Sequence, residues 1–278
     1  MPNLATISEQ EFSKFQHFIH EVSGINLSSA KKYMVCGRLA RRIQDCNLPS
    51  YGAYFQLLAS GEAAAEVQIA IDLLTTNETY FFREPKHFDW LRRVVSSARE
   101  STQPFRVWSA ASSSGEEAYS IAMTLADCLG WAAWEVVGSD ISARVLKRAC
   151  TGHYSMERAT HIPVDYLKRF CMRGVGEEQG TLLIKRELRQ RVRFCHVNLN
   201  AALPQLGSFD VIFLRNVMIY FNDETKRRVV ARLVAQLKPG GSFLIGHSES
   251  LHGINEAVEP VAPAIYRYNG GRRPARVA

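Results

Sequence analysis

The sequence predicts an α/β protein: a mostly parallel sheet covered by helices on both faces, preceded by an N-terminal all-helical domain and interrupted by a small antiparallel β insertion. Residues 1–75 show helical periodicity without a strand pattern, and from Phe105 onward short apolar strands alternate with amphipathic helices. The alternation breaks at residues 163–191, where glycines crowd a turn between two apolar segments. We therefore expect domains at 1–75 and 76–278, with the insertion inside the second.

The first domain opens with a helix-start signal. Ser8 and Glu11 have the spacing of a capping box, in which each side chain accepts a hydrogen bond from the other residue's backbone N–H. Apolar residues at helical spacing then run to Gly24, a residue typical of helix ends. Further helices are expected over residues 29–45, 51–59 and 62–74.

The second domain begins with a mixed segment and a helix that starts near Pro85, a residue suited to a first helical turn. Strands are expected at 105–109, 135–139, 192–197, 211–214 and 242–246, with an edge strand at 261–268. Helices are expected at 115–129, 142–150 and 223–237. A turn at residues 238–241 should join the last helix to its strand, since it contains Pro239 and two glycines.

Bulk composition excludes several classes of protein. The chain has 278 residues, of which 46% are hydrophobic and 22% charged, as in globular proteins. No apolar run could span a bilayer and the N-terminus lacks signal-peptide features, so a cytoplasmic protein is expected. Six cysteines without a C-x-x-C pair predict reduced thiols, not disulfides or a metal site. The net charge of +7, partly from arginines at 272–276, permits anionic partners without choosing one.

One helix face in the first domain is mostly positive. Lys31, Arg38, Arg41, Arg42 and Asp45 recur at helical intervals in the segment 29–45. Such a face could dock an acidic partner or be an ordinary solvated surface, and the sequence leaves both interpretations open.

Small residues and two glutamates follow the first strand, at the edge of the sheet where such folds bind ligands. The stretch from Ser109 to Gly115 lets a cofactor approach the backbone, but it is not the G-x-G-x-x-G pattern of dinucleotide-binding proteins. Glu116 and Glu117 would repel a phosphate at the following helix start. They suit a cationic ligand, and S-adenosylmethionine has an ammonium, a sulfonium and no phosphate. The alternative, in which a glutamate only stabilises its own helix, is favoured for Glu116.

Polar residues also follow the later strands. Asp140 stands where a carboxylate accepts both ribose hydroxyls, although it could instead cap the next helix. Asn198 and Leu199 could hold an adenine edge and face. Arg215 and Asn216 come directly behind a buried strand, where polar groups need partners.

Four motifs in the same order resemble the CheR family, the chemotaxis-receptor methyltransferases. They are T-N-E-T-Y-F-F-R-E (76–84), V-W-S-A-A-S-S-S-G-E-E-A-Y-S-I-A (107–122), S-D-I-S-A-R-V-L (139–146) and F-D-V-I-F-L-R-N-V-M-I-Y-F (209–221). The resemblance covers almost the whole chain and implies a Rossmann-like class I methyltransferase sheet. It also implies S-adenosylmethionine as cofactor, S-adenosylhomocysteine as product, and glutamate side chains of chemoreceptor cytoplasmic helices as substrate. Ser114 replaces a frequent threonine and Ala118 a frequent proline.

Carried over residue by residue, the resemblance implies a set of cofactor contacts. Glu117 would bind the amino group of the methionyl moiety, Asp140 the ribose, and Asn198 with Leu199 the adenine end. The remaining residues implied to line the pocket or to touch the cofactor or reacting carboxylate are Asn77, Thr79, Arg83, Arg215, Asn216 and Tyr220.

Two of these residues are candidates for the methyl-transfer step. A glutamate carboxylate, with a pKa of about 4.3, is already ionised at neutral pH, so no general base is required. We expect catalysis by positioning, with Arg83 and Tyr220 holding the carboxylate in line with the methyl group. No metal is expected.

Partners and rival functions follow from the same reading. The basic face near Arg38, Arg41 and Arg42 would meet the receptor helix, and the insertion could capture a receptor C-terminal peptide by strand addition. We expect a monomer with neither nucleic acid nor membrane insertion. The rivals are a methyltransferase acting on RNA or a small molecule, a non-catalytic adaptor, and, disfavoured by the missing glycine pattern, an NAD oxidoreductase.

Overall fold

A computed structural model describes residues 6–97 and 103–270; the arginine-rich segment at 272–276 lies outside this range. Helices lie at α1 (Glu9–Ser23), α2 (Lys32–Asp45), α3 (Tyr51–Ala59), α4 (Ala64–Leu74), α5 (Lys86–Ser97), α6 (Glu116–Leu129), α7 (Ala143–Thr151), α8 (Val164–Phe170), α9 (Arg186–Arg189) and α10 (Asp223–Val234). Short 3₁₀ turns lie at η1 (Ser29–Lys31), η2 (Met156–Ala159), η3 (Gly176–Glu178) and η4 (Met218–Tyr220). Strands lie at β1 (Phe105–Ser109), β2 (Trp134–Asp140), β3 (His153–Ser155), β4 (Cys171–Arg173), β5 (Thr181–Ile184), β6 (Val192–His196), β7 (Phe209–Leu214), β8 (Leu237–Ile245), β9 (Val258–Ala262) and β10 (Ile265–Tyr268).

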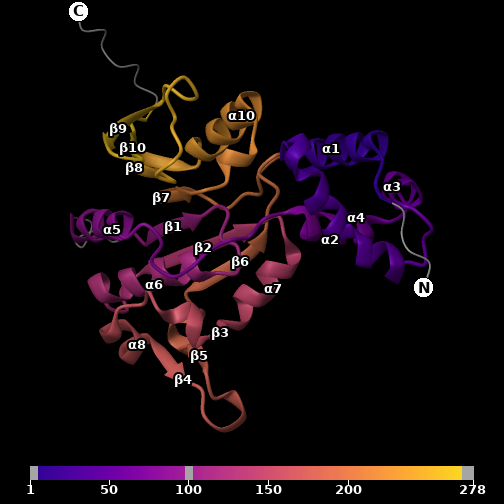
Figure 1. The fold of residues 1–278 in the computed structure, drawn as a ribbon. Helices are drawn as coiled ribbons and strands as arrows, with labels where there is room; N and C mark the ends of the chain where they lie inside the picture. The colour runs from indigo at the N-terminus through magenta and orange to yellow at the C-terminus, as the bar shows by residue number, and fades with distance from the viewer. Residues whose placement is uncertain (1–5, 98–102, 271–278) are drawn as a thin grey trace, which may run out of the picture.

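The helices α1–α4 pack around their own core beside the main sheet (Figure 1). The capping box of Ser8 and Glu11 is present, and Gly24 ends α1 in the left-handed conformation. Phe15 and Tyr54 are fully buried between these helices. The predicted all-helical domain is therefore confirmed, with the basic segment divided into η1 and α2.

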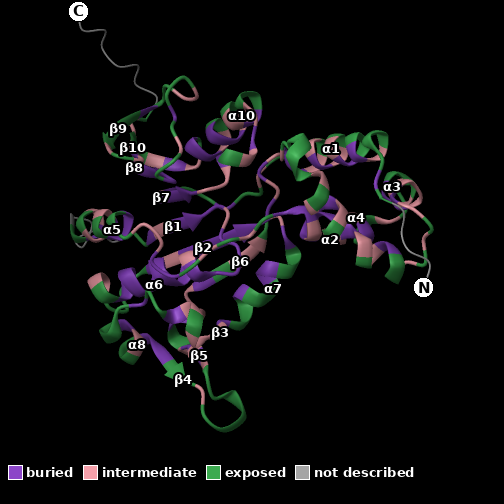
Figure 2. Ribbon diagram, in the orientation of Figure 1, coloured by how far each residue is buried: buried purple, intermediate pink, exposed green. Residues whose placement is uncertain are grey.

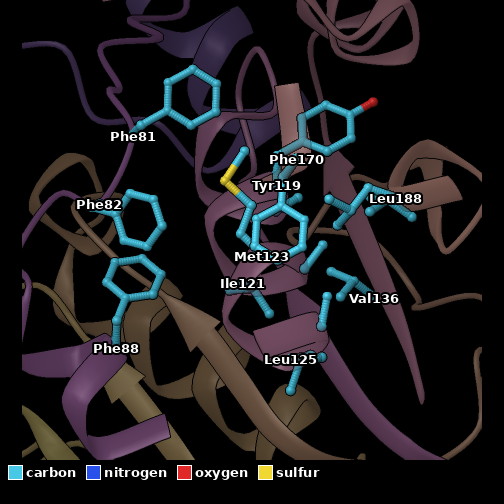
Figure 3. Packing of buried hydrophobic residues seen from close by; sticks show 14 of the residues in the cluster. Phe81, Phe82, Phe88, Tyr119, Ile121, Met123, Leu125, Val136, Phe170 and Leu188 are labelled. Carbon is cyan, nitrogen blue, oxygen red and sulfur yellow. The ribbon is translucent and has the colours of Figure 1, made fainter. Parts of the chain in front are cut away.

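The main sheet has seven strands in the order β6-β2-β1-β7-β8-β10-β9. The first five are parallel, as the alternation of strands and helices predicts. Successive residues of β1 face opposite sides: Val107 joins one buried cluster with α5 and α6, and Trp108 joins another with α10. The central strands β1, β2 and β7 are accordingly mostly buried (Figure 2), and aromatic side chains such as Phe88 and Tyr119 pack in the first of these clusters (Figure 3).

Two details at the end of the chain differ from the prediction. The expected turn at 238–241 belongs to β8, because the strand continues through the glycines past a register irregularity opposite β7. The expected single edge strand at 261–268 is two antiparallel strands, and β10 lies between β8 and β9. The reversal lies between those strands, where Ala264 has a φ of 60°.

The β insertion is a separate three-stranded antiparallel sheet in the order β3-β5-β4 (Figure 1). It includes β3, so it begins before residue 163, the expected start of the insertion. Its short first strand is bounded by Gly152, and three residues carry too little periodicity to be recognised as a strand.

Several hydrogen bonds join the helical domain to the main sheet. The side chain of Gln68 donates to the carbonyl oxygen of Ile141, at 2.9 Å, and the backbone N–H of Asn26 donates to that of Tyr220, at 2.7 Å. All six cysteines are free thiols. Among the residues that the structure describes, no helix is both long and apolar enough to cross a bilayer.

Candidate functional site

A cavity of about 450 Å³ opens where the helical domain meets the carboxyl ends of the parallel strands. This volume lies in the range of small-molecule sites. All ten residues predicted for the site line it: Asn77, Thr79, Arg83, Glu117, Asp140, Asn198, Leu199, Arg215, Asn216 and Tyr220. The helical domain supplies another part of the wall, through residues 23, 25–28, 31 and 34.

The loop after β1 brings small residues against the cavity, as its composition predicts. Ala110, Ala111 and Ser113 line the cavity, so nothing larger separates a ligand from the backbone. Ser113 has a φ of 48°, and its backbone N–H donates to Asp140 at 2.9 Å. The loop is thereby fixed to the end of β2.

Asp140 is almost fully buried at the end of β2. Its two carboxylate oxygens accept backbone N–H groups from Ser113 and Ser142, each at 2.9 Å. Burial raises the pKa of this carboxyl group, and these hydrogen bonds oppose the rise. Asp140 therefore orders two loops and lines the cavity. The N-cap of α7 is Ser142, whose side chain accepts the Val145 N–H, so the prediction that Asp140 caps this helix is wrong, and its contact with a ribose stays a prediction.

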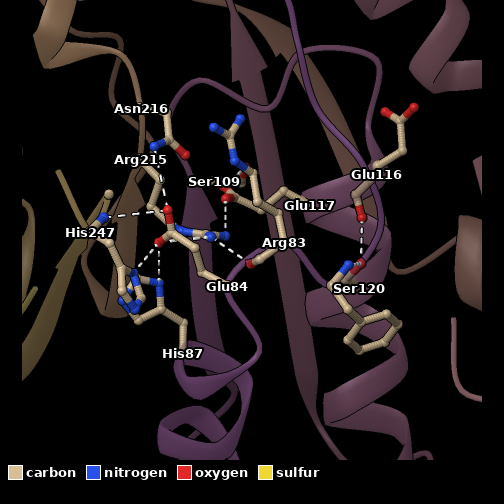
Figure 4. A network of polar contacts seen from close by, with 12 residues as sticks. Arg83, Glu84, His87, Ser109, Glu116, Glu117, Ser120, Arg215, Asn216 and His247 are labelled. Atoms are coloured by element: carbon tan, nitrogen blue, oxygen red, sulfur yellow. Dashed lines mark hydrogen bonds and ion pairs between the residues drawn. The ribbon is translucent and has the colours of Figure 1, made fainter. Parts of the chain in front are cut away.

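Glu117 lies near the start of α6 and is paired with Arg215 (Figure 4). One carboxylate oxygen accepts from the Ser109 hydroxyl at 2.7 Å, and the other pairs with the Arg215 guanidinium at 2.8 Å. The Arg215 side chain is only 2% exposed. The partner that the buried Arg215 requires is therefore Glu117, the same residue that is predicted to bind the ammonium group.

Glu116 does not contribute to the cavity. Its buried carboxylate accepts from the Ser114 hydroxyl at 2.7 Å and from Arg158 Nε at 2.6 Å. Adjacent helical residues do not face the same side, and Figure 4 shows the Glu116 side chain directed away from Glu117. The charged residues of the lining are balanced, with Lys31, Arg83 and Arg215 against Glu78, Glu117 and Asp140. Of the two glutamates only Glu117 lines the cavity, which agrees with the interpretation favoured for Glu116, that it does not face a ligand.

Behind Arg215 lies a cluster that the sequence did not reveal: Glu84, His87 and His247 (Figure 4). Glu84 pairs with Arg215 at 3.1 Å and with the His247 ring at 2.7 Å. These partners outweigh burial and lower the pKa of Glu84 to about 2. Burial lowers the pKa of His87 to about 3, so His87 is neutral.

This cluster has ligand types and spacing that could hold a metal ion, since the ligand atoms lie within 4.8 Å of one another. However, the Arg215 guanidinium already provides a positive charge to Glu84. A divalent cation there would lie beside a buried arginine, which electrostatic repulsion opposes. The cluster is better described as support for Arg215 than as a metal centre.

The loop 75–84 supplies the remaining predicted residues. Arg83 stacks near the Tyr80 ring, 5.7 Å from its centroid, and donates to the Glu78 carbonyl oxygen at 3.2 Å. The backbone oxygen of Asn77 accepts from the Ser113 hydroxyl at 2.9 Å, which ties this loop to the loop after β1. Tyr220, at the end of η4, lines the same cavity.

Asn198 connects the cavity to the helical domain. Its amide nitrogen donates to the Val22 carbonyl oxygen at 2.6 Å, and its oxygen accepts from the backbone of Asn200 at 2.9 Å. Leu199 is buried beside it. The structure therefore shows a domain contact for Asn198, a role that its position in the sequence did not predict.

Left-handed backbone gathers around the cavity. Of the six described non-glycine residues with positive φ, four lie in it or directly behind it: Phe82, Glu84, Ser113 and Asn216. Glu249 stabilises the last of these by accepting the Asn216 N–H at 2.9 Å, together with N–H groups of Gly246 and Ile219. Strained backbone of this kind is typical of functional sites. For Phe82, Glu84 and Ser113 only the structure reveals it, because these residue types do not favour positive φ, whereas asparagine adopts it more readily.

The basic helix face is only partly free. Arg42 forms a two-bond ion pair with Glu66, and Arg38 donates to the carbonyl oxygens of Leu74 and Thr75 at 3.2 and 3.0 Å. Arg41 is exposed, as is Lys31 at the cavity edge. Intramolecular partners therefore occupy two of the three arginines predicted to form a docking face.

Comparison with known proteins identifies the family of this chain. The description "CheR methyltransferase, SAM binding domain" matches residues 77–266, and "CheR methyltransferase, all-alpha domain" matches residues 10–75. The chain belongs to the CheR methyltransferase family. It is 42% identical to the chemotaxis protein methyltransferase of Escherichia coli (strain K12) over 269 residues, covering 96% of this chain and 93% of that protein. It is 39% identical to chemotaxis protein methyltransferase 2 of Pseudomonas aeruginosa over 262 residues, covering 93% of each.

S-adenosylmethionine is the cofactor of this CheR family member, as its matched domain states. The cavity fits that ligand in two respects. Glu117 offers a carboxylate to an ammonium group, and Asp140 offers lone pairs to hydroxyls at the end of the neighbouring strand. The predicted fold, a methyltransferase sheet with an all-α domain and a small antiparallel sheet, is confirmed.

Proposed function

We propose that this enzyme transfers a methyl group from S-adenosylmethionine to glutamate side chains on the cytoplasmic helices of chemoreceptors. The product would be a glutamate methyl ester that serves chemotactic adaptation, formed in the cytoplasm where those helices lie. The observation that supports this most is that Arg83 and Tyr220 share one cavity with Glu117 and Asp140. The printed names of the relatives, chemotaxis protein methyltransferases, support the choice of partner.

The cofactor would be held along the edge of the sheet. Glu117 binds the ammonium group, Asp140 the ribose hydroxyls, and Leu199 packs on the adenine. When bound, S-adenosylmethionine supplies an electrophilic methyl group that a carboxylate oxygen can accept. Arg215 orients Glu117, because its guanidinium lies 2.8 Å from that carboxylate.

The acceptor carboxylate needs orientation, not deprotonation. Arg83 has its guanidinium at the cavity with only one described hydrogen bond, to a carbonyl oxygen, so it retains N–H groups for a carboxylate. Tyr220 offers a hydroxyl to the same cavity. Together they would place the substrate oxygen and lower the charge repulsion between substrate and Glu117.

Receptor docking would use the exposed cations beside the cavity. Lys31 is exposed at the cavity and Arg41 is exposed on α2, whereas Arg38 and Arg42 mainly order the helical domain. The small sheet would bind a receptor C-terminal peptide at a free strand edge, where Met172 is 46% exposed. We propose a monomer as the active form.

Titration with S-adenosylmethionine and S-adenosylhomocysteine, followed by a methyl-transfer assay on receptor fragments and on RNA, tests the proposal. Methylation of receptor fragments alone is expected. Transfer to RNA would support the rival methyltransferase, and cofactor binding without any turnover would support an adaptor.

Variants of the two acceptor-side residues test the mechanism. Arg83→Ala and Tyr220→Phe should each slow methyl transfer while S-adenosylhomocysteine still binds. A loss of about 1.5–3 kcal/mol of transition-state stabilisation is expected for Arg83, the value of a hydrogen bond to a charged group. Unchanged turnover in both variants would exclude the assigned roles. Arg41→Glu should weaken the salt-sensitive part of the rate, with Arg267→Glu, an exposed arginine on β10, as a control.

A further inference from the structure

Arg158 joins three segments that are far apart in the sequence. It lies in η2, directly after β3 of the small sheet. Its Nε donates to Glu116 at 2.6 Å, and its Nη2 donates to the carbonyl oxygen of Thr79 at 3.0 Å. Glu116 starts the helix behind the small-residue loop, and Thr79 belongs to the loop that carries Arg83. One guanidinium therefore ties the β insertion to two walls of the cofactor cavity.

Burial makes Glu116 dependent on its contact with Arg158. The Glu116 side chain is 0% exposed, so its carboxylate depends on the Arg158 guanidinium and the Ser114 hydroxyl for polar partners. A second contact, from β3, reinforces the first: the Tyr154 hydroxyl donates to the Ser114 carbonyl oxygen at 2.7 Å. Neither Arg158 nor Glu116 lines the cavity, so both act from behind its wall.

The planar guanidinium is needed because its two partners lie in different directions. Arginine presents several N–H groups in a fixed fork, whereas a lysine ammonium is a single point charge. A lysine at position 158 could keep the ion pair with Glu116 but could not also reach the Thr79 carbonyl oxygen in the same geometry.

We propose that Arg158 is a positioning residue for the cofactor: it holds the loop 76–83 and the start of α6 at the separation that S-adenosylmethionine requires. Through Arg158, the position of the small sheet determines the positions of the loops around the cofactor cavity. The inference rests on the cofactor assignment, and its effect on turnover rests on the proposed methyl transfer. Displacement of these loops should weaken cofactor binding, because small misplacements of binding groups have large effects.

Three variants separate positioning from a purely structural role. Arg158→Met leaves Glu116 buried without its ion pair and should lower both the melting temperature and cofactor affinity. The double variant Arg158→Met, Glu116→Gln removes both charges and should recover the melting temperature. Its affinity for S-adenosylhomocysteine should stay roughly ten- to hundredfold below wild type, because the Thr79 anchor is still absent. Arg158→Lys should likewise keep its stability and lose affinity.

The measurements are calorimetric titration of the full chain with S-adenosylhomocysteine, thermal unfolding without ligand, and KM and kcat with S-adenosylmethionine. KM should rise more than kcat falls. Arg169→Met is the matched control, since Arg169 also belongs to the insertion region and pairs with Asp127 at 2.5 Å, on α6 away from its start. If the folded double and lysine variants bind S-adenosylhomocysteine as wild type does, the inference is wrong.

The same titrations keep this inference separate from the proposed substrate. Binding of S-adenosylhomocysteine does not require a methyl acceptor. Wild-type binding without receptor methylation would therefore overturn the proposed function and leave the test of Arg158 intact.

Discussion

Replacement of Glu117 by glutamine removes the negative charge proposed to bind the ammonium group of S-adenosylmethionine. The amide keeps the shape of the side chain and can still accept from either Ser109 or Arg215, which now lie 2.7 and 2.8 Å from its two oxygens. Arg215 also retains Glu84 at 3.1 Å, so it is not left unpaired. The variant should therefore fold, with a loss of about 1–2 kcal/mol in the free energy of unfolding.

The expected loss of affinity follows from the burial of this carboxylate. Glu117 is 12% exposed, so its hydrogen bond to an ammonium is a charge-assisted contact in a largely water-free site. Such bonds contribute about 1.5–3 kcal/mol. Since 1.4 kcal/mol is a factor of ten, the Kd for S-adenosylmethionine should rise about ten- to 150-fold.

Calorimetric titration at constant ionic strength measures this change. Glu135→Gln is the control, because Glu135 pairs with Arg106 at the opposite end of β2 from Asp140. Methylthioadenosine, which lacks the amino-acid moiety, is the matched ligand and should bind wild type and Glu117→Gln equally. Equal affinity of the two proteins for S-adenosylmethionine would refute the assignment, as would an equal loss for methylthioadenosine.

Three further predictions test the site and its supports. Asp140→Asn places an amide N–H against a backbone N–H that the carboxylate now accepts, so calorimetry should show affinities for S-adenosylhomocysteine and adenosine lowered by about 1.5–3 kcal/mol. His87 has a pKa depressed to about 3 in the folded protein, so the unfolded chain takes up its proton first as the pH falls through about 6.5. This histidine should remove about 2 kcal/mol of stability between about pH 7 and pH 5, and His87→Leu should abolish that part of the pH dependence in chemical denaturation. If the dependence persists, another group causes it. Arg42→Met should destabilise the helical domain by about 1–3 kcal/mol, because Glu66, which also accepts a hydrogen bond from the buried Tyr54 hydroxyl, loses its cation, whereas Arg41→Met should leave denaturation unchanged.

The fold was predictable because each element carries a local signal. The alternation of apolar strands with amphipathic helices indicates the parallel sheet, and the capping box of Ser8 and Glu11 indicates the first helix. The end of the chain was less predictable. Pro239 and its glycines read as a turn, yet pairing with β7 holds them in a strand, which only a long-range contact can determine.

The site was predictable in its membership but not in its charge balance. Residues after each strand are brought to one edge by the topology of the sheet, so Asp140 and Arg215 could be placed there without knowing their partners. The residues that support this site from behind could not be predicted in the same way. His247 and Arg158 come from distant segments, and no periodicity in the sequence indicates that they support Glu84 and Glu116. Glu116 and Glu117 could be told apart in advance, because a helix directs neighbouring side chains about 100° apart and only one of the two can face the cavity.

The wall that the helical domain contributes to the cavity has a consequence for protein engineering. Asn198 bonds to the carbonyl oxygen of Val22, and Asn26 bonds to that of Tyr220, so ligand-lining segments of the two parts hold each other in place. Chimaeras that exchange only the first 75 residues between relatives would combine unmatched halves of one binding surface. The first 75 residues would need to be transferred together with the residues around positions 198 and 220. Affinity for the nucleoside, and not receptor choice alone, would then report whether the chimaera is intact.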